Sequence, residues 1–116
     1  MKNYSKQTKD VNDFLEILSK DHPRVAEGFT AIHKAASEDG VISSKHKELI
    51  ALAIAITIRC EGCIACHIKT ALEQSASEKE IIETIGVAIA MGGGPSVVYG
   101  EKAYKAMKEF KATLTI

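Results

Sequence analysis

The sequence lacks a net charge, a long hydrophobic run and an apolar leader, and each absence narrows what the protein can be. Its 116 residues carry 15 Lys and Arg against 15 Asp and Glu, so no bulk field attracts nucleic acid or an anionic membrane surface. The longest apolar run covers residues 49–58 with Thr57 as its one polar member. It has about half of the roughly 20 residues that a membrane-spanning helix needs. We therefore expect neither a nucleic-acid partner nor insertion into a membrane.

The N-terminus MKNYSKQTKDVNDF contains no apolar stretch of the kind found in secretory signals, which favours a cytoplasmic protein. Cysteine is scarce as well, and the three that are present cannot all pair within one chain. Because cytoplasmic thiols are kept reduced, a purely structural disulfide rarely persists there. Clustered cysteines in such a chain favour catalysis or metal binding.

Signals for β-structure are nearly absent, apart from one isolated hairpin-type turn pair at residues 39–40. Helical periodicity instead recurs along the chain and predicts an all-α, single-domain bundle of about six helices spanning residues 1–116. The third helix is apolar around most of its circumference, so we expect it to be the central, most buried one, with the first two as scaffold. The first expected helix carries an apolar stripe at 11–18 and ends at 21–23, the second runs from 23 to before 40, and the third runs from 43 or 44 to about 58. Three further helices are expected to begin near 62, 77 and 95, with a tight glycine turn at 92–94 before the last one.

All three cysteines lie within residues 60–66, directly before a histidine. Cys63 and His67 are four residues apart at the start of an expected helix, so their side chains share one face. A helix N-terminus favours a thiolate, and a neighbouring imidazole can accept the thiol proton. Cys60 is close enough in the chain to form a disulfide when Cys63 is oxidised. The pattern predicts a dithiol that can cycle between reduced and oxidised forms.

Two other interpretations of this cluster are packing and metal binding. Buried cysteine also serves as a small apolar residue, which favours packing for Cys66 taken alone. A Cys3His metal set would use Cys60, Cys63, Cys66 and His67, but structural zinc sites usually draw their ligands from two separated pairs. Four ligands at the start of one helix would be crowded, so the most reasonable metal site is an ion or cluster shared between protomers. An iron–sulfur cluster would also require a fourth cysteine. We expect no metal and no bound cofactor.

The stretch ELIALAIAITIRCEGCIACHIKTAL resembles the carboxymuconolactone decarboxylase and alkyl hydroperoxidase D family. The peroxidase branch of that family carries Glu, eleven residues, Cys-x-x-Cys, three residues and His, and Glu48, Cys60, Cys63 and His67 fit this spacing. The resemblance extends over residues 29–110, which we take as the core of the domain. It implies an all-helical protomer that assembles into a homo-oligomer, often a trimer or a hexamer.

The resemblance also implies roles for the matching residues. Cys63 would be the attacking thiolate, Cys60 the resolving or partner-exchanging thiol, and His67 with Glu48 a proton relay. A glutamate in the first turn of a helix also commonly does no more than complement the helix dipole. Cys66 departs from the family pattern, because relatives generally carry a larger residue there; it would be a second resolving thiol or an inert one.

The geometry of such a relay is not obvious from the sequence. The twelve residues from Glu48 to Cys60 would span roughly 18 Å in an unbroken helix. Contact between Glu48 and His67 therefore requires the third helix to break before Cys60, the helices to cross steeply, or a neighbouring protomer to supply one partner. His46 is the one other histidine near enough in sequence to Glu48 to modify the relay.

These observations predict a thiol-dependent oxidoreductase that acts on a hydroperoxide or a small disulfide and is restored by a dithiol protein or a small thiol. A decarboxylase-like lyase acting on a small lactone acid is the first alternative, although the chain offers only Arg24 and Arg59 for a dicarboxylate. The second alternative is a non-enzymatic oligomer whose cysteines sense redox state.

Overall fold

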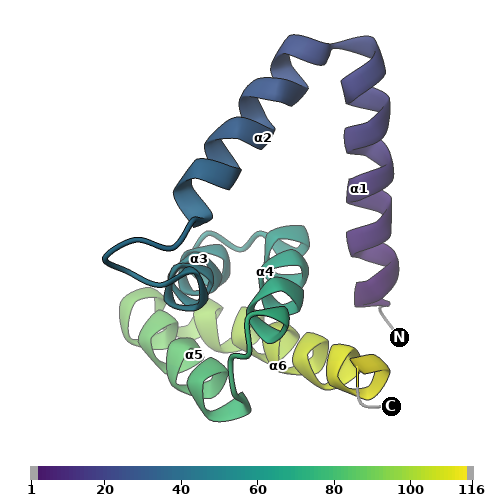
Figure 1. Cartoon of the computed structure of the whole chain (residues 1–116). Coiled ribbons are helices and arrows are strands. Elements are labelled where there is room, and N and C mark those ends of the chain that lie inside the picture. The colour runs from purple at the N-terminus through teal and green to yellow at the C-terminus, as the bar shows by residue number, and fades with distance from the viewer. Residues whose placement is uncertain (1–2, 115–116) are drawn as a thin grey trace.

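The computed structural model describes residues 3–114, and this part of the chain forms α-helices without a strand, as Figure 1 shows. The all-α prediction is therefore confirmed. The helices are α1 (Tyr4–Asp21), α2 (Pro23–Ser37), α3 (Ser44–Thr57), α4 (Glu61–Glu73), α5 (Glu78–Gly92) and α6 (Gly94–Leu114). None of these described helices is long and apolar enough to cross a bilayer.

The helices begin where local capping chemistry places them. Ser43 caps α3, since its hydroxyl oxygen accepts a hydrogen bond of 3.2 Å from the backbone N–H of His46. Ser77 and Glu80 form a reciprocal capping box at the start of α5, with hydrogen bonds of 2.9 and 3.1 Å. Pro23 occupies the first turn of α2, where a missing N–H costs no hydrogen bond. The predicted starts of these helices are confirmed.

The glycine run forms the tight turn expected between the last two helices. Gly92 ends α5, and Gly93 has a φ of +68°, a left-handed conformation that glycine adopts without steric cost. The N–H of Gly93 donates to the carbonyl of Ile89 at 2.8 Å, and α6 starts at the next residue.

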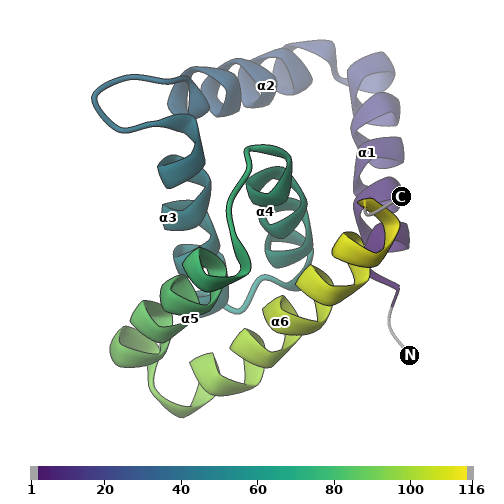
Figure 2. The same cartoon turned by 60° about the horizontal axis from the view of Figure 1, so that its bottom comes forward.

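Helix α4 lies at the centre of the molecule, where it packs against α3, α6 and α1 (Figure 2). Helices α3 and α6 also pack against α5. The largest fully buried side chains come from α3, α4, α5 and α6 and form the core; they are Leu52, Ile56, Ile64, Ile68, Ile81, Ser96 and Met107.

The expectation that the third helix is the most buried is wrong. Ile50 and Ile54 of α3 are 49% and 55% exposed. In α4, by contrast, Glu73 is the one exposed residue, and the others are buried or half-buried. Apolar residues surround α3, and its contacts with α2, α4, α5 and α6 leave part of this apolar surface uncovered in the described chain. Helix α4 is the enclosed one because α1, α3 and α6 contact it from different sides.

Helices α1 and α2 form an arm that extends away from the core (Figure 1). Ala26 is the single buried residue of α2. The apolar stripes predicted from the sequence are present, but the rest of the described chain covers them only in part. The large apolar side chains that stay exposed on these two helices are Val11, Phe14, Ile17, Val25, Phe29 and Ile32. A homo-oligomer, trimer or hexamer, stays a prediction.

The close approach of α5 and α6 can be tested at Gly100. A methyl group added to this buried glycine would lie 2.7 Å from the Cγ2 atom of Ile85, so the Ile85 side chain or one of the two helices has to shift. We expect Gly100→Ala to lower the free energy of unfolding by about 1–3 kcal/mol. Gly86→Ala is the matched control on α5, because no atom lies within 4 Å of its added methyl. Urea unfolding measures both, and equal stability of the two variants would contradict this packing.

Candidate functional site

The turn between α3 and α4 positions the first cysteine. Helix α3 ends at Thr57, and Arg59 follows with a φ of +62°. The N–H groups of Arg59 and Cys60 donate to the carbonyls of Ile56 and Ala55 at 3.1 and 3.0 Å. This paired hydrogen-bond pattern is the Schellman motif, which normally places glycine at the left-handed residue. It reverses the chain and delivers Cys60 as the N-cap of α4.

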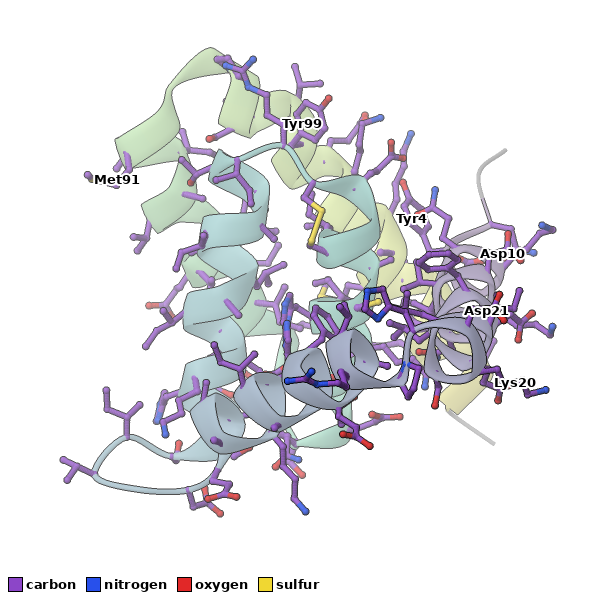
Figure 3. The ribbon with its side chains drawn as sticks, turned by 90° about the horizontal axis from the view of Figure 1, so that it is seen from above. Tyr4, Asp10, Lys20, Asp21, Met91 and Tyr99 are labelled. Carbon is purple, nitrogen blue, oxygen red and sulfur yellow. A yellow bond between two sulfur atoms is a disulfide. The ribbon has the colours of Figure 1, made fainter. Side chains whose placement is uncertain are left out.

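Cys60 and Cys63 are joined by a disulfide at the start of α4, which Figure 3 shows as a yellow bond. Their Cα atoms are 5.2 Å apart, within the usual range for a disulfide. The Sγ atom of Cys60 also accepts a hydrogen bond of 3.3 Å from the N–H of Cys63. The structure therefore brings together the two cysteines of the Cys-x-x-Cys motif, in their oxidised form. The Cys60 sulfur lies at the positive end of the α4 dipole.

Glu48 and His67 meet within one chain. The Nδ1 atom of His67 lies 3.1 Å from the Oε1 atom of Glu48, although the residues are 19 apart in sequence. Of the three arrangements that would allow this contact, the structure shows the break of the third helix before Cys60. Helix α3 stops at Thr57, and α4 then packs back against it. The unbroken helix up to Cys60 that the estimate of roughly 18 Å assumed is not present, because α3 ends three residues before Cys60.

Burial makes this pair an orienting contact for the imidazole. The Glu48 side chain is 6% exposed and that of His67 is 22% exposed, and a buried carboxylate needs a hydrogen-bond donor. When Nδ1–H donates to Glu48, the Nε2 atom of a neutral imidazole keeps its lone pair and can accept a proton. Cys63 precedes His67 by one helical turn, which places the two Cβ atoms about 5–6 Å apart. Cys63 is in the disulfide here, and its reduction would place a thiol one helical turn from this imidazole.

The two auxiliary residues are placed less closely. Cys66 carries a free, half-buried thiol; burial raises the pKa of this thiol, and the charge of Lys69 partly opposes the shift. His46 is exposed, and its Nδ1 atom lies 2.8 Å from the hydroxyl of Ser43. The structure thus holds His46 at the cap of α3 and gives it no hydrogen bond to Glu48.

The four candidate metal ligands do not form a cluster in this structure. Cys60 and Cys63 are bonded to each other. In the described part of the chain, no group of three or more His, Cys, Asp or Glu side chains is arranged to hold a metal ion.

Arg59 is a site residue that the sequence analysis did not single out for the dithiol. It directly precedes Cys60, its side chain is exposed and its backbone is left-handed. A left-handed residue after a helix is usually glycine. Only the observed φ therefore shows that Arg59 takes this left-handed position.

The model of the carboxymuconolactone decarboxylase family matches residues 23–107. An uncharacterized protein of Haemophilus influenzae is 36% identical over 109 residues, which cover 94% of this chain and 96% of that protein. Among solved structures, a carboxymuconolactone decarboxylase family protein from Legionella pneumophila is 41% identical with a TM-score of 0.90, covering 92% of this chain and 96% of the other. A Thermotoga maritima protein of the same family shares the fold, with a TM-score of 0.84 at 24% identity and coverage of 94% and 92%.

The state of the three cysteines can be tested by thiol titration. We expect one reactive thiol per unfolded oxidised chain and three after reduction, because Cys60 and Cys63 are bridged. In the folded oxidised protein, iodoacetamide should modify Cys66 slowly at neutral pH, since burial disfavours its thiolate. The rate should rise with pH to a midpoint above the ordinary cysteine pKa. The unfolded chain is the control, and a folded midpoint at or below that of the unfolded chain would contradict this placement.

Proposed function

The chain belongs to the carboxymuconolactone decarboxylase family, and we propose that within this family it is a thiol-dependent oxidoreductase that reduces hydroperoxides or small disulfides. The observation that carries this proposal is the Cys60–Cys63 disulfide with the Glu48–His67 pair beside it. A lyase reaction has no use for a dithiol, whereas a thiol-dependent peroxidase or disulfide reductase can cycle one between its reduced and oxidised forms.

Activation of the nucleophile is the first step. In the reduced protein, Nε2 of His67 accepts the proton of the Cys63 thiol, and the Glu48 carboxylate stabilises the resulting imidazolium. The start of α4 adds the partial positive charge of a helix N-terminus. Both effects favour the thiolate, which is the form that reacts.

With a hydroperoxide, the Cys63 thiolate attacks the terminal oxygen and the O–O bond breaks. Cys63 becomes a sulfenic acid, and the departing alkoxide takes the proton from His67 to leave as an alcohol. The sulfur of Cys60 then attacks Cys63, water departs, and the disulfide seen in the structure forms. The hydroperoxide is reduced by two electrons, and the dithiol is oxidised by two.

An external dithiol protein or small thiol restores the enzyme by thiol–disulfide exchange. Its thiolate attacks one sulfur of the bridge to form a mixed disulfide, and a second external thiol releases the reduced chain. Because His67 and the start of α4 stabilise the Cys63 thiolate, the external thiol attacks Cys60 and Cys63 is the leaving group. Reduction of a small disulfide runs the same exchange with that disulfide as the oxidant, so no bound cofactor is needed.

The proposal predicts the outcome of adding one equivalent of an organic hydroperoxide to the fully reduced protein. We expect rapid loss of two thiols and a Cys60–Cys63 bridge, which peptide mass spectrometry maps. Cys63→Ser should abolish turnover while the fold is kept, because a hydroxyl is a far weaker nucleophile than a thiolate. Cys66→Ser is the matched control and should keep both bridge formation and turnover.

Three outcomes would contradict the proposal. They are three thiols that stay free with both hydroperoxide and disulfide substrates, full activity of Cys63→Ser, and activity that survives complete alkylation of the thiols. The last would favour the lyase alternative, in which Glu48 and His67 alone handle protons.

The proton-relay role of His67 can be separated from a structural one. We expect His67→Asn to slow alkylation of Cys63 at pH 7 by about a hundredfold, as for loss of a general base. Glu48→Gln should have a smaller effect, about tenfold, because the imidazole stays in place with weaker orientation. His46→Asn is the matched control at the exposed cap of α3 and should leave the rate unchanged. Equal rates for His46→Asn and His67→Asn would remove His67 from the mechanism.

A further inference from the structure

Arg59 occupies a conformation in which its side chain is unfavourable for the backbone. Its φ of +62° lies in the left-handed region, where a Cβ atom crowds the following carbonyl and glycine is preferred. Helix α4 ends in the same way at Ser75, whose φ is +70°. There the N–H groups of Ser75 and Ala76 donate to the carbonyls of Leu72 and Ala71 at 3.0 and 2.9 Å. Arg59 and Ser75 are therefore a matched pair of left-handed helix ends formed by residues other than glycine, and only Arg59 carries a charge beside the dithiol.

The Arg59 guanidinium has no partner within the described chain. Some other surface cations are held by carboxylates, as Lys45 is by Glu80 at 2.9 Å and Lys111 is by Glu78 at 2.8 Å. Residues 3–114 provide no ion pair or hydrogen bond to the exposed Arg59 side chain. Its side chain therefore adds no polar contact to the fold, while its charge remains available to a molecule arriving from solvent.

We propose that Arg59 is a specificity-determining residue that binds a carboxylate on the molecule approaching the Cys60–Cys63 pair. The assignment rests on the proposed function of that dithiol. Arg59 is directly bonded to Cys60, so the charge is anchored one residue from the first sulfur. A guanidinium donates two parallel hydrogen bonds to a carboxylate and is permanently charged, which suits it to this group. The preferred substrate is then a small hydroperoxide or disulfide that carries a carboxylate near its reactive bond.

A test that does not depend on turnover compares iodoacetate with iodoacetamide, which differ mainly in the carboxylate. The reduced protein carries Cys66→Ser so that only Cys60 and Cys63 react, and mass spectrometry follows both. Removing the guanidinium in Arg59→Gly should lower the ratio of iodoacetate to iodoacetamide rates by about threefold, as for an exposed charge pair. High salt should lower the ratio in the parent protein in the same direction.

Three variants isolate the charge from the backbone. Ser75→Gly relaxes the other left-handed helix end and should leave the ratio unchanged. Arg24→Gln removes one positive charge from α2 and should also leave it unchanged. Arg59→Lys keeps the charge without the planar fork and should give an intermediate ratio. An unchanged ratio in Arg59→Gly, or an equal fall in Arg24→Gln, would overturn the assignment.

Steady-state assays then decide which carboxylate source the enzyme uses. A hydroperoxide with and without a carboxylate is compared, and so is a small disulfide with and without one. We expect Arg59→Gly to lower kcat/KM by at least about threefold for the carboxylate form of one class, with its neutral form unchanged. An equal loss on charged and neutral forms would place Arg59 in the chemistry of the dithiol and overturn its role in recognition. Absence of turnover on every substrate would refute the proposed function, while the alkylation ratio would still decide Arg59.

Discussion

The hydrogen-bonded turn between α3 and α4 is the constraint on which the site depends. Two bonds from Arg59 and Cys60 to the carbonyls at the end of α3 stop that helix and reverse the chain. The same residue that completes the turn, Cys60, starts α4 as its N-cap. The reversal packs α4 against α3, and it is this packing that brings Glu48 to His67. The dithiol and the imidazole–carboxylate pair are therefore products of one local backbone event.

The enclosure of α4 determines how far its cysteines and histidine are buried. One face of this helix supplies buried apolar residues to the core, including Ile64 and Ile68. The neighbouring positions are only half-buried, and Cys63, Cys66 and His67 occupy them. These three residues therefore lie at the boundary between the core and the surface. The buried Glu48 carboxylate belongs there because His67 provides its hydrogen bond.

The described chain leaves two features, on the arm and beside the disulfide, without intramolecular partners. One is the apolar surface of the α1–α2 arm, where Ala26 is the only buried residue of α2. The other is the Arg59 charge beside the disulfide. An amphipathic helix gains most of its stability from packing of its apolar face, and a guanidinium gains from a planar anion. Both features are therefore available for contact with other molecules.

Local chemistry determined much of this protein from its sequence alone. Pro23, the Ser77 capping box and the glycine turn at 92–94 act over a few residues, so the helix bounds followed from them, as did the spacing of Cys60, Cys63 and His67 along one helix. The contact between Glu48 and His67 did not follow, because it depends on where α3 stops and on a left-handed Arg59 that no propensity favours. The covered side of α3 and the open face of the arm were decided only by tertiary packing. An apolar stripe predicts that a face can be buried, but the arrangement of the other helices determines whether anything in the same chain covers it.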